Sequence, residues 1–277
     1  MFNFGQFQTL KINRQAPPGL YLTDEEENEV LLPNKYIPEN FEIGDEIEVF
    51  LYLDHEERPV ATTLKPFVTL DEFAKLRCVE VTEFGAFLDW GLEKHLFVPF
   101  KEQAYPMQKG HWYLIFCYLD EETQRLAASS KVLHFLDNAE ITVEPYEKVD
   151  LIVANKTDLG FNLIVNNLHK GLVYHSDVFQ DLQTGDQLKG WITKVRKDGK
   201  IDVTLQRPGY RSIEPNADKI MQILGENDGF LPLHDKSSPE EIQETLEMSK
   251  KSFKRAIGTL YKNRQIKIVP KEGIYLR

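Results

Sequence analysis

The 277-residue chain carries one sequence pattern three times. In each copy a glycine opens a run rich in β-forming residues, and these runs begin at Gly44, Gly110 and Gly185. The first two glycines are 66 positions apart and the next two are 75 positions apart. Repetition at such spacing predicts that the first three quarters of the chain consist of three copies of one folding unit.

The pattern predicts five short strands in each copy. A second glycine-led strand lies upstream of the long run, and these upstream strands begin at Gly19, Gly85 and Gly160. Five short strands in about 60–70 residues, separated by glycine turns, are typical of a small closed β-barrel. Because proline-containing segments separate the copies, we place the barrels at residues 1–64, 72–131 and 146–208.

The last sixty residues change from strand to helix periodicity. Apolar residues follow a helical spacing after Asn216, which we expect to cap a first helix. The run Ser238-Pro239-Glu240-Glu241 has the residues of a capping box and predicts a second helix. A third helix capped by Ser249 precedes a polar-tipped hairpin. Three helices and a hairpin resemble an α+β winged helix-turn-helix domain, at residues 215–277.

The third helix of this segment is strongly amphipathic. Its apolar stripe follows the i, i+3, i+4, i+7 spacing of one buried face: Phe253, Ala256, Ile257 and Leu260. Cations project from the opposite face, around Gly258, which would permit close approach of a ligand to the backbone. The alternative interpretation is a solvated surface helix. With Lys271 at the tip of the hairpin, the candidate phosphate contacts are Lys250, Lys251, Lys254, Arg255, Lys262 and Lys267.

Charge is distributed unevenly along the chain. The net charge of −11 taken alone argues against nucleic-acid binding. However, residues 1–62 hold 13 acidic and 4 basic residues, whereas residues 250–277 hold 9 basic residues and 1 acidic residue. Because a polyanion responds to local charge within a Debye length of ~8–10 Å, it would be attracted to the C-terminal segment.

The barrels resemble the S1-like RNA-binding domain of ribosomal proteins, an OB-fold. The resemblance rests on Gly85-Ala86-Phe87-Leu88 in the second copy and on Gly171-Leu172-Val173-Tyr174-His175-Ser176 in the third, which matches best. In that family an aromatic residue after the glycine and a histidine on the following strand face RNA. The resemblance carries these roles to Phe87 and Tyr174, and by position to Tyr21 in the first copy.

The copies also depart from the family pattern. The second has His95 and Val98 where glycine and histidine are expected, and the first has Leu32 at the histidine position. The third has Asn162 at the aromatic position, with Phe161 beside it. The first copy is also the most acidic, so we do not expect it to bind RNA.

In the third copy, aromatic and basic residues are predicted to share a surface. Lys194 and Arg196 alternate with Ile192 on one face of a strand and would flank Tyr174 and Phe161. An aromatic ring stacks on an unpaired base while nearby cations follow the phosphates. The alternative is that the rings fill the barrel and the cations are solvated. The candidate RNA contacts in the barrels are Phe87, Phe161, Tyr174, His175, Lys194 and Arg196.

The order of three such barrels and a winged helix is uncommon. Over its whole length the chain resembles the CvfB family of bacterial proteins, also called conserved virulence factor B or YitL-like. The C-terminal run from Lys250 to Lys262 adds to this resemblance. It implies a mainly β, multidomain protein that binds single-stranded or structured RNA and regulates gene expression, including that of virulence factors.

The sequence carries no motif that predicts an enzyme. Phosphate-binding glycine loops, Cys-x-x-Cys pairs and His-Glu-x-x-His zinc motifs are absent, and we expect no cofactor and no metal. No apolar run approaches the ~20 residues of a membrane span, and the N-terminus does not resemble a signal peptide. Two cysteines are too few for a disulfide framework, which favours a cytoplasmic setting.

Three other functions are compatible with the sequence. A DNA-binding transcription factor would use the winged helix and prefer duplex DNA. A protein-interaction adaptor would bind no nucleic acid near physiological salt. A nuclease would degrade RNA with a divalent metal, although no converging carboxylates indicate one.

Overall fold

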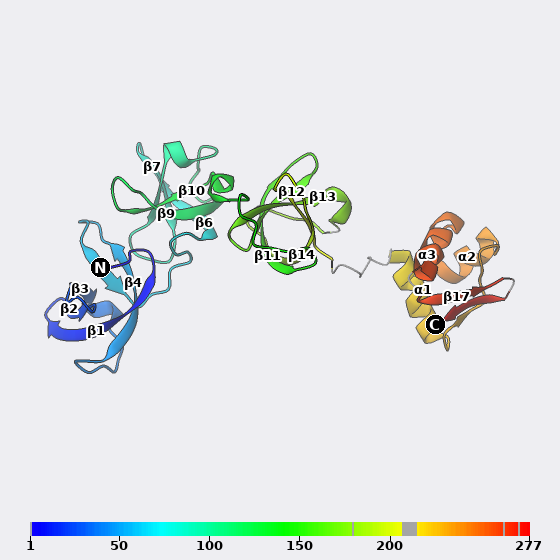
Figure 1. Ribbon diagram of the computed structural model, residues 1–277, viewed down its shortest axis with the longest axis horizontal. Coiled ribbons are helices and arrows are strands. Elements are labelled where there is room, and N and C mark those ends of the chain that lie inside the picture. Colours follow the sequence, from blue (N-terminus) through cyan, green and yellow to red (C-terminus); the bar gives the residue numbers. More distant parts are fainter. Residues whose placement is uncertain (1, 179, 207–214, 263, 271) are drawn as a thin grey trace. The chain divides into compact units, whose positions relative to one another are not determined.

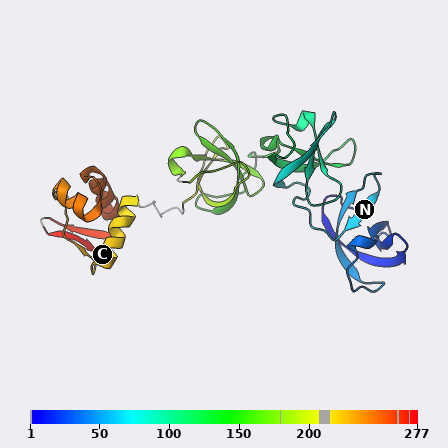
Figure 2. The ribbon, with the colours of Figure 1, turned by 180° about the vertical axis from the view of Figure 1, so that it is seen from behind.

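A computed structural model of the protein describes residues 2–178, 180–206, 215–262, 264–270 and 272–277. The chain divides into two compact units, Met1–Leu205 and Gln206–Arg277. The first unit contains three closed five-stranded barrels, and the second combines helices with a small sheet (Figures 1 and 2). This confirms the predicted fold class of three tandem OB-like barrels and a C-terminal winged helix.

The three barrels share one strand order, in which the fifth strand lies between the third and the fourth. The first barrel consists of β1 (Phe7–Ala16), β2 (Gly19–Thr23), β3 (Glu29–Pro33), β4 (Glu46–Leu53) and β5 (Pro59–Thr62). The second consists of β6 (Phe73–Val81), β7 (Gly85–Asp89), β8 (Leu96–Pro99), β9 (Trp112–Leu119) and β10 (Leu126–Ser129). The third consists of β11 (Lys148–Lys156), β12 (Gly160–Val165), β13 (His169–Tyr174), β14 (Gln187–Val195) and β15 (Ile201–Thr204).

Short 3-10 helices accompany the barrels. They are η1 (Asn34–Tyr36), η2 (Phe100–Glu102), η3 (Val132–Phe135) and η4 (His175–Asp177). Three of them follow the third strand of a barrel directly, and η3 follows the last strand of the second barrel.

The glycine that opens the second strand of each barrel is required by a close contact. A Cβ atom at Gly160 would lie 1.9 Å from the carbonyl oxygen of Val173 on β13. The corresponding distances are 2.0 Å at Gly19 and 2.4 Å at Gly85. No side chain fits at these distances, so the repeated glycine follows from backbone packing between the second and third strands.

The first strand of each barrel contains a register shift, which bends the strand as a β-bulge does. Immediately after the bulge, one residue of the first strand lies directly opposite one residue of the second strand. The resulting cross-strand pairs are Arg14 with Tyr21, Glu80 with Phe87, and Asn155 with Asn162.

Neighbouring barrels are joined by apolar contacts that use equivalent positions. Phe50 of β4 packs edge-on against Trp90 of the second barrel, with 5.8 Å between ring centroids, and shares one buried cluster with it. Phe116 of β9, at the equivalent ladder position, belongs to a cluster that also contains Ile164 of the third barrel. The two junctions thus bury the same ridge of the fourth strand.

The third barrel differs at this ridge. Its equivalent residue is Trp191 on β14, which pairs with Lys148 on β11. The Lys148 Nζ lies 5.9 Å from the centroid of the indole ring. The corresponding pairs in the first two barrels consist of two phenylalanines each: Phe7 with Phe50, and Phe73 with Phe116.

The second unit is a winged-helix domain. It contains α1 (Pro215–Glu226), β16 (Phe230–Leu231), α2 (Pro239–Leu246), α3 (Lys250–Lys262), β17 (Ile266–Val269) and β18 (Gly273–Leu276), with β18 central in the sheet. The predicted capping box is present, because the Ser238 Oγ accepts the amide of Glu241 at 3.1 Å. The first helix begins at Pro215, so Asn216 lies within it and does not cap it. Lys271 lies outside the described residues.

The segment between the second and third barrels is held by a fully buried histidine. The Nε2 of His169 accepts the backbone amide of Thr142 at 3.1 Å, which leaves Nδ1 to donate to the carbonyl of Asp137 at 2.6 Å. These two bonds connect β13 to both ends of residues 137–142. They also satisfy both ring nitrogens of an imidazole that has no exposed surface.

We expect His169→Leu to lower the free energy of unfolding by about 1–3 kcal/mol, since it removes two hydrogen bonds from the imidazole to the backbone, each of which contributes about 0.5–1.5 kcal/mol. Urea denaturation followed by tryptophan fluorescence would measure the change. The matched control is His111→Leu, because the side chain of His111 is exposed in the second barrel. An equal effect of both substitutions would contradict the anchoring role of His169.

Candidate nucleic-acid interface

The strand ladders define which residues are equivalent in the three barrels. The glycine that opens each second strand lies opposite Pro33 in the first barrel, Pro99 in the second and Tyr174 in the third. The sequence pattern predicts Leu32 and Val98 at this position, which is one residue too early in each barrel. Of the three equivalent residues, only Tyr174 is aromatic.

In the third barrel, Tyr174 belongs to a hydrogen-bonded group on the outer face. The Arg196 guanidinium donates to both carboxylate oxygens of Asp202, each at 2.8 Å, and also to the Tyr174 hydroxyl. Its hydrogen bonds to Asp202 raise the pKa of the Arg196 guanidinium. The carboxylate of Asp202 also offsets the positive charge of Arg196. The tyrosine ring is half-buried and therefore held in one orientation on this face.

Lys194 lies on the same face, opposite Asp202 in the β14–β15 ladder. Its side chain is exposed and forms no ion pair or hydrogen bond with any residue that the structure describes. The predicted alternation with Ile192 is interrupted by a register shift between the two residues. As a result Ile192 and Val195 both pack on the core, while Lys194 faces outward.

Two other predicted contacts in the third barrel have structural roles. Phe161 is only 8% exposed and belongs to the barrel core, so its ring faces are not available to a base. His175, in η4, is exposed; its ring lies edge-on to Phe161 with 5.5 Å between centroids. The Nε2 of His175 donates to the carbonyl of Thr157 at 3.0 Å, which leaves Nδ1 for a ligand.

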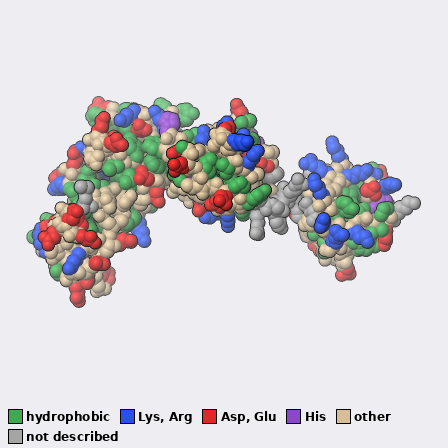
Figure 3. Space-filling model, in the orientation of Figure 1, with side chains coloured by type: hydrophobic (Ala, Val, Ile, Leu, Met, Phe, Trp, Pro, Cys, Tyr) green, Lys and Arg blue, Asp and Glu red, His purple; other side chains and the backbone are tan. Residues whose placement is uncertain are grey.

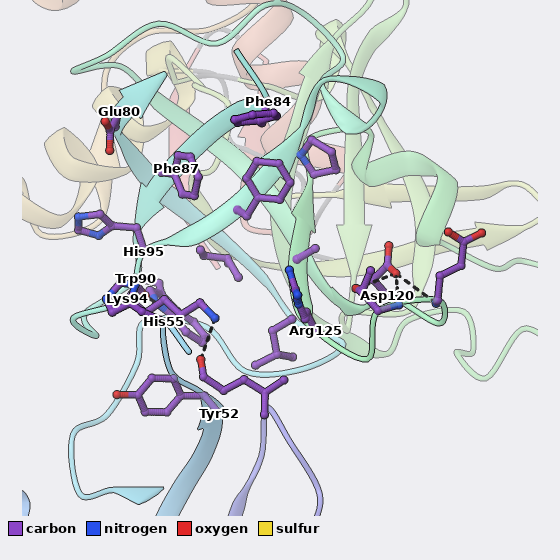
Figure 4. Close-up of a pocket in the computed structure, with 18 of the residues that line it drawn as sticks. Tyr52, His55, Glu80, Phe84, Phe87, Trp90, Lys94, His95, Asp120 and Arg125 are labelled. Carbon is purple, nitrogen blue, oxygen red and sulfur yellow. Dashed lines mark hydrogen bonds between the residues drawn. The ribbon is translucent and has the colours of Figure 1, made fainter. Parts of the chain in front are cut away.

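The second barrel presents a face with three phenylalanines. Phe87 and Phe97 are paired across β7 and β8, with 5.1 Å between ring centroids and a 41° tilt. Phe84, in the turn before β7, is 68% exposed. All three line a cavity, in which Phe84 and Phe87 project from neighbouring parts of the barrel (Figure 4). Phe87 is predicted from the sequence as an RNA contact, whereas Phe97 is not; its alternation with the buried Leu96 and Val98 is the signal that indicates it.

In the first barrel the residue equivalent to Phe87 is Tyr21, and one face of its ring is covered by Arg14. The Arg14 guanidinium lies 3.7 Å from the centroid of the Tyr21 ring and forms an ion pair with Glu29 at 2.6 Å. A base therefore cannot stack on that side of Tyr21 without displacing Arg14. That the acidic first barrel does not bind RNA stays a prediction.

In the winged helix, α3 buries its apolar stripe and exposes its basic face. Phe253, Ala256, Ile257 and Leu260 are all buried, as the sequence predicts. Lys250 is half-buried. The other predicted cations, four on the helix and one on β17, have exposed side chains: Lys251, Lys254, Arg255, Lys262 and Lys267. Figure 3 shows several Lys and Arg side chains on the visible face of this unit.

Two further features of α3 lie on this basic face. Tyr261 is 59% exposed, so an aromatic ring accompanies the cations. A Cβ atom at Gly258 would meet no atom within 4 Å, so nothing in the described structure requires glycine there. Glycine in a helix costs about 1 kcal/mol relative to alanine, and open space beside it leaves the backbone accessible to a ligand.

The described residues contain no group of three or more His, Cys, Asp or Glu that could hold a metal ion. Both cysteines are buried, and burial raises the pKa of Cys117 to about 12, so this thiol is not a nucleophile at neutral pH. Among the helices that the structure describes, none is both long and apolar enough to cross a membrane.

Two protein families match parts of the chain. The CvfB-like winged helix domain matches residues 218–276, and the S1 domain matches residues 4–64. The S1 match therefore falls on the first barrel, whereas the sequence motifs appeared closest to the family in the third. Both domain types support nucleic-acid binding, and neither is a catalytic type.

Relatives match over most of the chain. YitL of Bacillus subtilis (strain 168) is 31% identical over 275 residues, which cover 95% of this chain and 90% of YitL. Conserved virulence factor B of Staphylococcus aureus (strain USA300) is 29% identical, over 83% of this chain and 79% of that protein. A solved structure of a multidomain protein with nucleic acid binding domains from Streptococcus pneumoniae TIGR4 is 24% identical, with a TM-score of 0.42 and coverage of 99% and 98%. By its identity to YitL across nearly the whole length of both proteins, the chain belongs to the CvfB family of S1-like and winged-helix proteins.

Proposed function

We propose that this protein binds RNA through its third barrel and its winged helix, and that it regulates gene expression. The observation that carries the proposal is the basic face of α3, where exposed cations surround Gly258 and Tyr261. The name conserved virulence factor B, borne by several relatives, supports a regulatory role. We further propose that the protein is cytoplasmic and has no catalytic activity.

The third barrel would supply base recognition. The Tyr174 ring is oriented by its hydrogen bond to Arg196, so it offers a fixed face for stacking. Stacking of a base on an aromatic ring contributes ~1–3 kcal/mol. Lys194 projects from the same face and carries a positive charge that Asp202 offsets only partly, because Asp202 is bound to Arg196. A single strand whose base reaches Tyr174 therefore passes a cation that can contact its phosphate.

The combination of domains favours RNA over duplex DNA. A tyrosine on the outer face of an OB-type barrel contacts bases only when they are unpaired. The winged helix alone would also suit the major groove of DNA, because an exposed basic helix is the common means of contact. Duplex binding would use α3 without any need for Tyr174, so the two functions predict different contributions from the barrel.

The direct test is a fluorescence-anisotropy titration of the full chain with single-stranded RNA and duplex DNA of equal length. Both probes are titrated at two salt concentrations, with magnesium present and probe integrity monitored. We expect tighter, salt-sensitive binding of RNA that remains intact. Preference for duplex DNA would establish the transcription-factor function instead, degraded RNA would indicate a nuclease, and no binding to either probe would point to a protein partner.

The cations of both sites are tested together by Lys194→Gln, Lys251→Gln and Arg255→Gln in one variant. Each phosphate contact contributes about 0.7 to the slope of log K against log salt for single strands, so the slope should fall by up to about 2. The matched control is Lys11→Gln, Lys65→Gln and Lys109→Gln, which removes the same charge from exposed positions elsewhere. Equal slopes for the two triple variants would refute the assigned surface.

Gly258→Ala separates folding from binding. Because a Cβ atom there meets no neighbour, alanine should raise the stability of the winged helix by up to about 1 kcal/mol. If a phosphate approaches the helix backbone at Gly258, the same variant should bind RNA more weakly. Thermal denaturation and anisotropy measure the two effects, with Gly225→Ala in α1 as the control, since its Cβ also meets no neighbour. Unchanged affinity of Gly258→Ala would exclude close approach at this glycine.

A further inference from the structure

A groove on the second barrel combines aromatic rings with carboxylates. It is lined by residues of β9, of the turn that follows β9, and of the short helices η2 and η3. Its volume is about 450 Å³, within the ~300–1,000 Å³ range of pockets that bind small groups. None of the described residues of β7 or β8 lines it, so the groove does not include the face that carries Phe87 and Phe97.

One wall of the groove is a stack of three rings. The ring of Phe135 on η3 lies nearly parallel to that of Phe116 on β9, with 4.3 Å between centroids and 26° between planes. It also lies nearly parallel to the ring of Tyr118, with 5.8 Å between centroids and 25° between planes. Phe116 is buried, whereas Tyr118 and Phe135 are half-buried and line the groove. Part of each of these two rings is therefore available to a ligand.

The lining of the groove is negatively charged. Four carboxylates and one ammonium group belong to it, which leaves three negative charges in excess: Asp71, Glu102, Asp120 and Glu121 against Lys101. Such a lining repels phosphates and attracts cations. Among the described residues no three carboxylates are grouped so that they could hold a metal ion, so we consider a cationic side chain.

Two of the carboxylates are fixed in position. The carbonyl of Glu102 accepts the amide of Ser130 at 3.0 Å, which holds η2 against the end of β10. The Oδ1 of Asp120 accepts the amide of Thr123 at 2.8 Å and its hydroxyl at 2.9 Å. Burial, together with the carboxylates of Glu102 and Asp120, raises the pKa of Tyr118 to about 12, so its hydroxyl stays protonated at neutral pH. The carboxylate of Glu102 accepts no hydrogen bond from any residue that the structure describes, and it is therefore available to a ligand.

The first barrel shows how this protein holds a guanidinium group. Arg14 lies over the Tyr21 ring at 3.7 Å and pairs with Glu29 at 2.6 Å, so one ring and one carboxylate bind it together. The groove of the second barrel offers the same two components, but no arginine is among its lining residues. A guanidinium is planar and always charged, so it can stack on a ring while it pairs with a carboxylate, whereas an ammonium group cannot stack. The groove therefore fits an arginine side chain from another molecule.

We propose that this groove docks an arginine-bearing segment of a protein partner, with the guanidinium stacked on Phe135 and Tyr118 and paired with the carboxylate of Glu102. The proposal goes beyond RNA binding, which we place on α3 and the third barrel, and does not depend on it. The protein would then hold a basic partner and a nucleic acid on different domains at the same time.

The experiment is a fluorescence-anisotropy titration of the full chain with three labelled peptides near physiological salt and without RNA. Each peptide has three residues of one kind separated by glycines: arginine, lysine, or citrulline, which has the planar shape of arginine without its charge. We expect the Kd of the arginine peptide to be about threefold or more below that of the lysine peptide, because only the guanidinium stacks, and the citrulline peptide not to bind. Equal binding of the arginine and lysine peptides, tight binding of the citrulline peptide, or no binding of the arginine peptide would overturn the proposal and leave RNA binding standing.

Paired variants locate the bound peptide. Glu102→Gln with Glu121→Gln removes two carboxylates of the groove and should raise the Kd of the arginine peptide about fivefold. The control, Glu46→Gln with Glu48→Gln, removes the same charge from exposed positions on β4 and should change the Kd by less than about twofold. Equal effects of the two double variants would show attraction by the net charge of the chain and overturn the groove as the site.

Tyr118→Leu tests the contribution of the ring. It should reduce the preference for the arginine peptide over the lysine peptide, because the guanidinium loses a stacking surface while the carboxylates remain. Trp112→Leu is the control, since Trp112 is an exposed aromatic residue of the same barrel outside the groove. An unchanged preference in Tyr118→Leu would contradict stacking in the groove.

The alternative occupant is the basic segment of a second copy of this chain, because residues 250–277 hold 9 basic residues and 1 acidic residue. Sedimentation velocity of the full chain without peptide distinguishes the two occupants. A monomer at the concentrations of the titration supports a different protein as the partner. Self-association that Glu102→Gln with Glu121→Gln abolishes would assign the groove to a second copy and overturn the proposal.

Discussion

The contact between the second and third strands is the constraint on which each barrel depends. At Gly19, Gly85 and Gly160 the neighbouring carbonyl lies where a Cβ atom would be, so the two strands approach closely at their crossing point. This approach, with the bulge in the first strand, lets five short strands curve far enough to close. Closure in turn fixes which side chains face outward, and therefore which residues are available to a ligand.

One equivalent position carries a different side-chain arrangement in each of the three barrels. Opposite the residue that follows the bulge, the first barrel has a tyrosine covered by arginine, the second a phenylalanine beside glutamate, and the third an asparagine hydrogen-bonded to another asparagine. A covered ring, an open ring and an amide pair cannot bind the same group. At this position the barrels therefore differ in side chains while their strand order is the same.

The sequence was sufficient to predict the barrels, the winged helix and the buried stripe of α3, because glycine spacing, capping residues and periodicity are local signals. It was insufficient where closure shifts the register. The bulge after Ile192 separates that residue from Lys194, and the ladders place Pro33 and Pro99, rather than Leu32 and Val98, at the position of Tyr174. The burial of Phe161 and the pairing of Arg196 with Asp202 depend on tertiary contacts, which no local pattern encodes.

The exchange of two phenylalanines for Lys148 and Trp191 on the third barrel has a consequence for how such arrays grow. In each of the first two barrels a pair of phenylalanines packs against the next barrel. A third such pair would allow a further barrel, added by gene duplication, to pack in the same way. Lys148 beside the Trp191 indole makes the packing of another barrel on this position costly, because the ammonium group would lose its water on burial. The third barrel thus resembles the terminal module of a repeat protein, whose polar outer face ends the series.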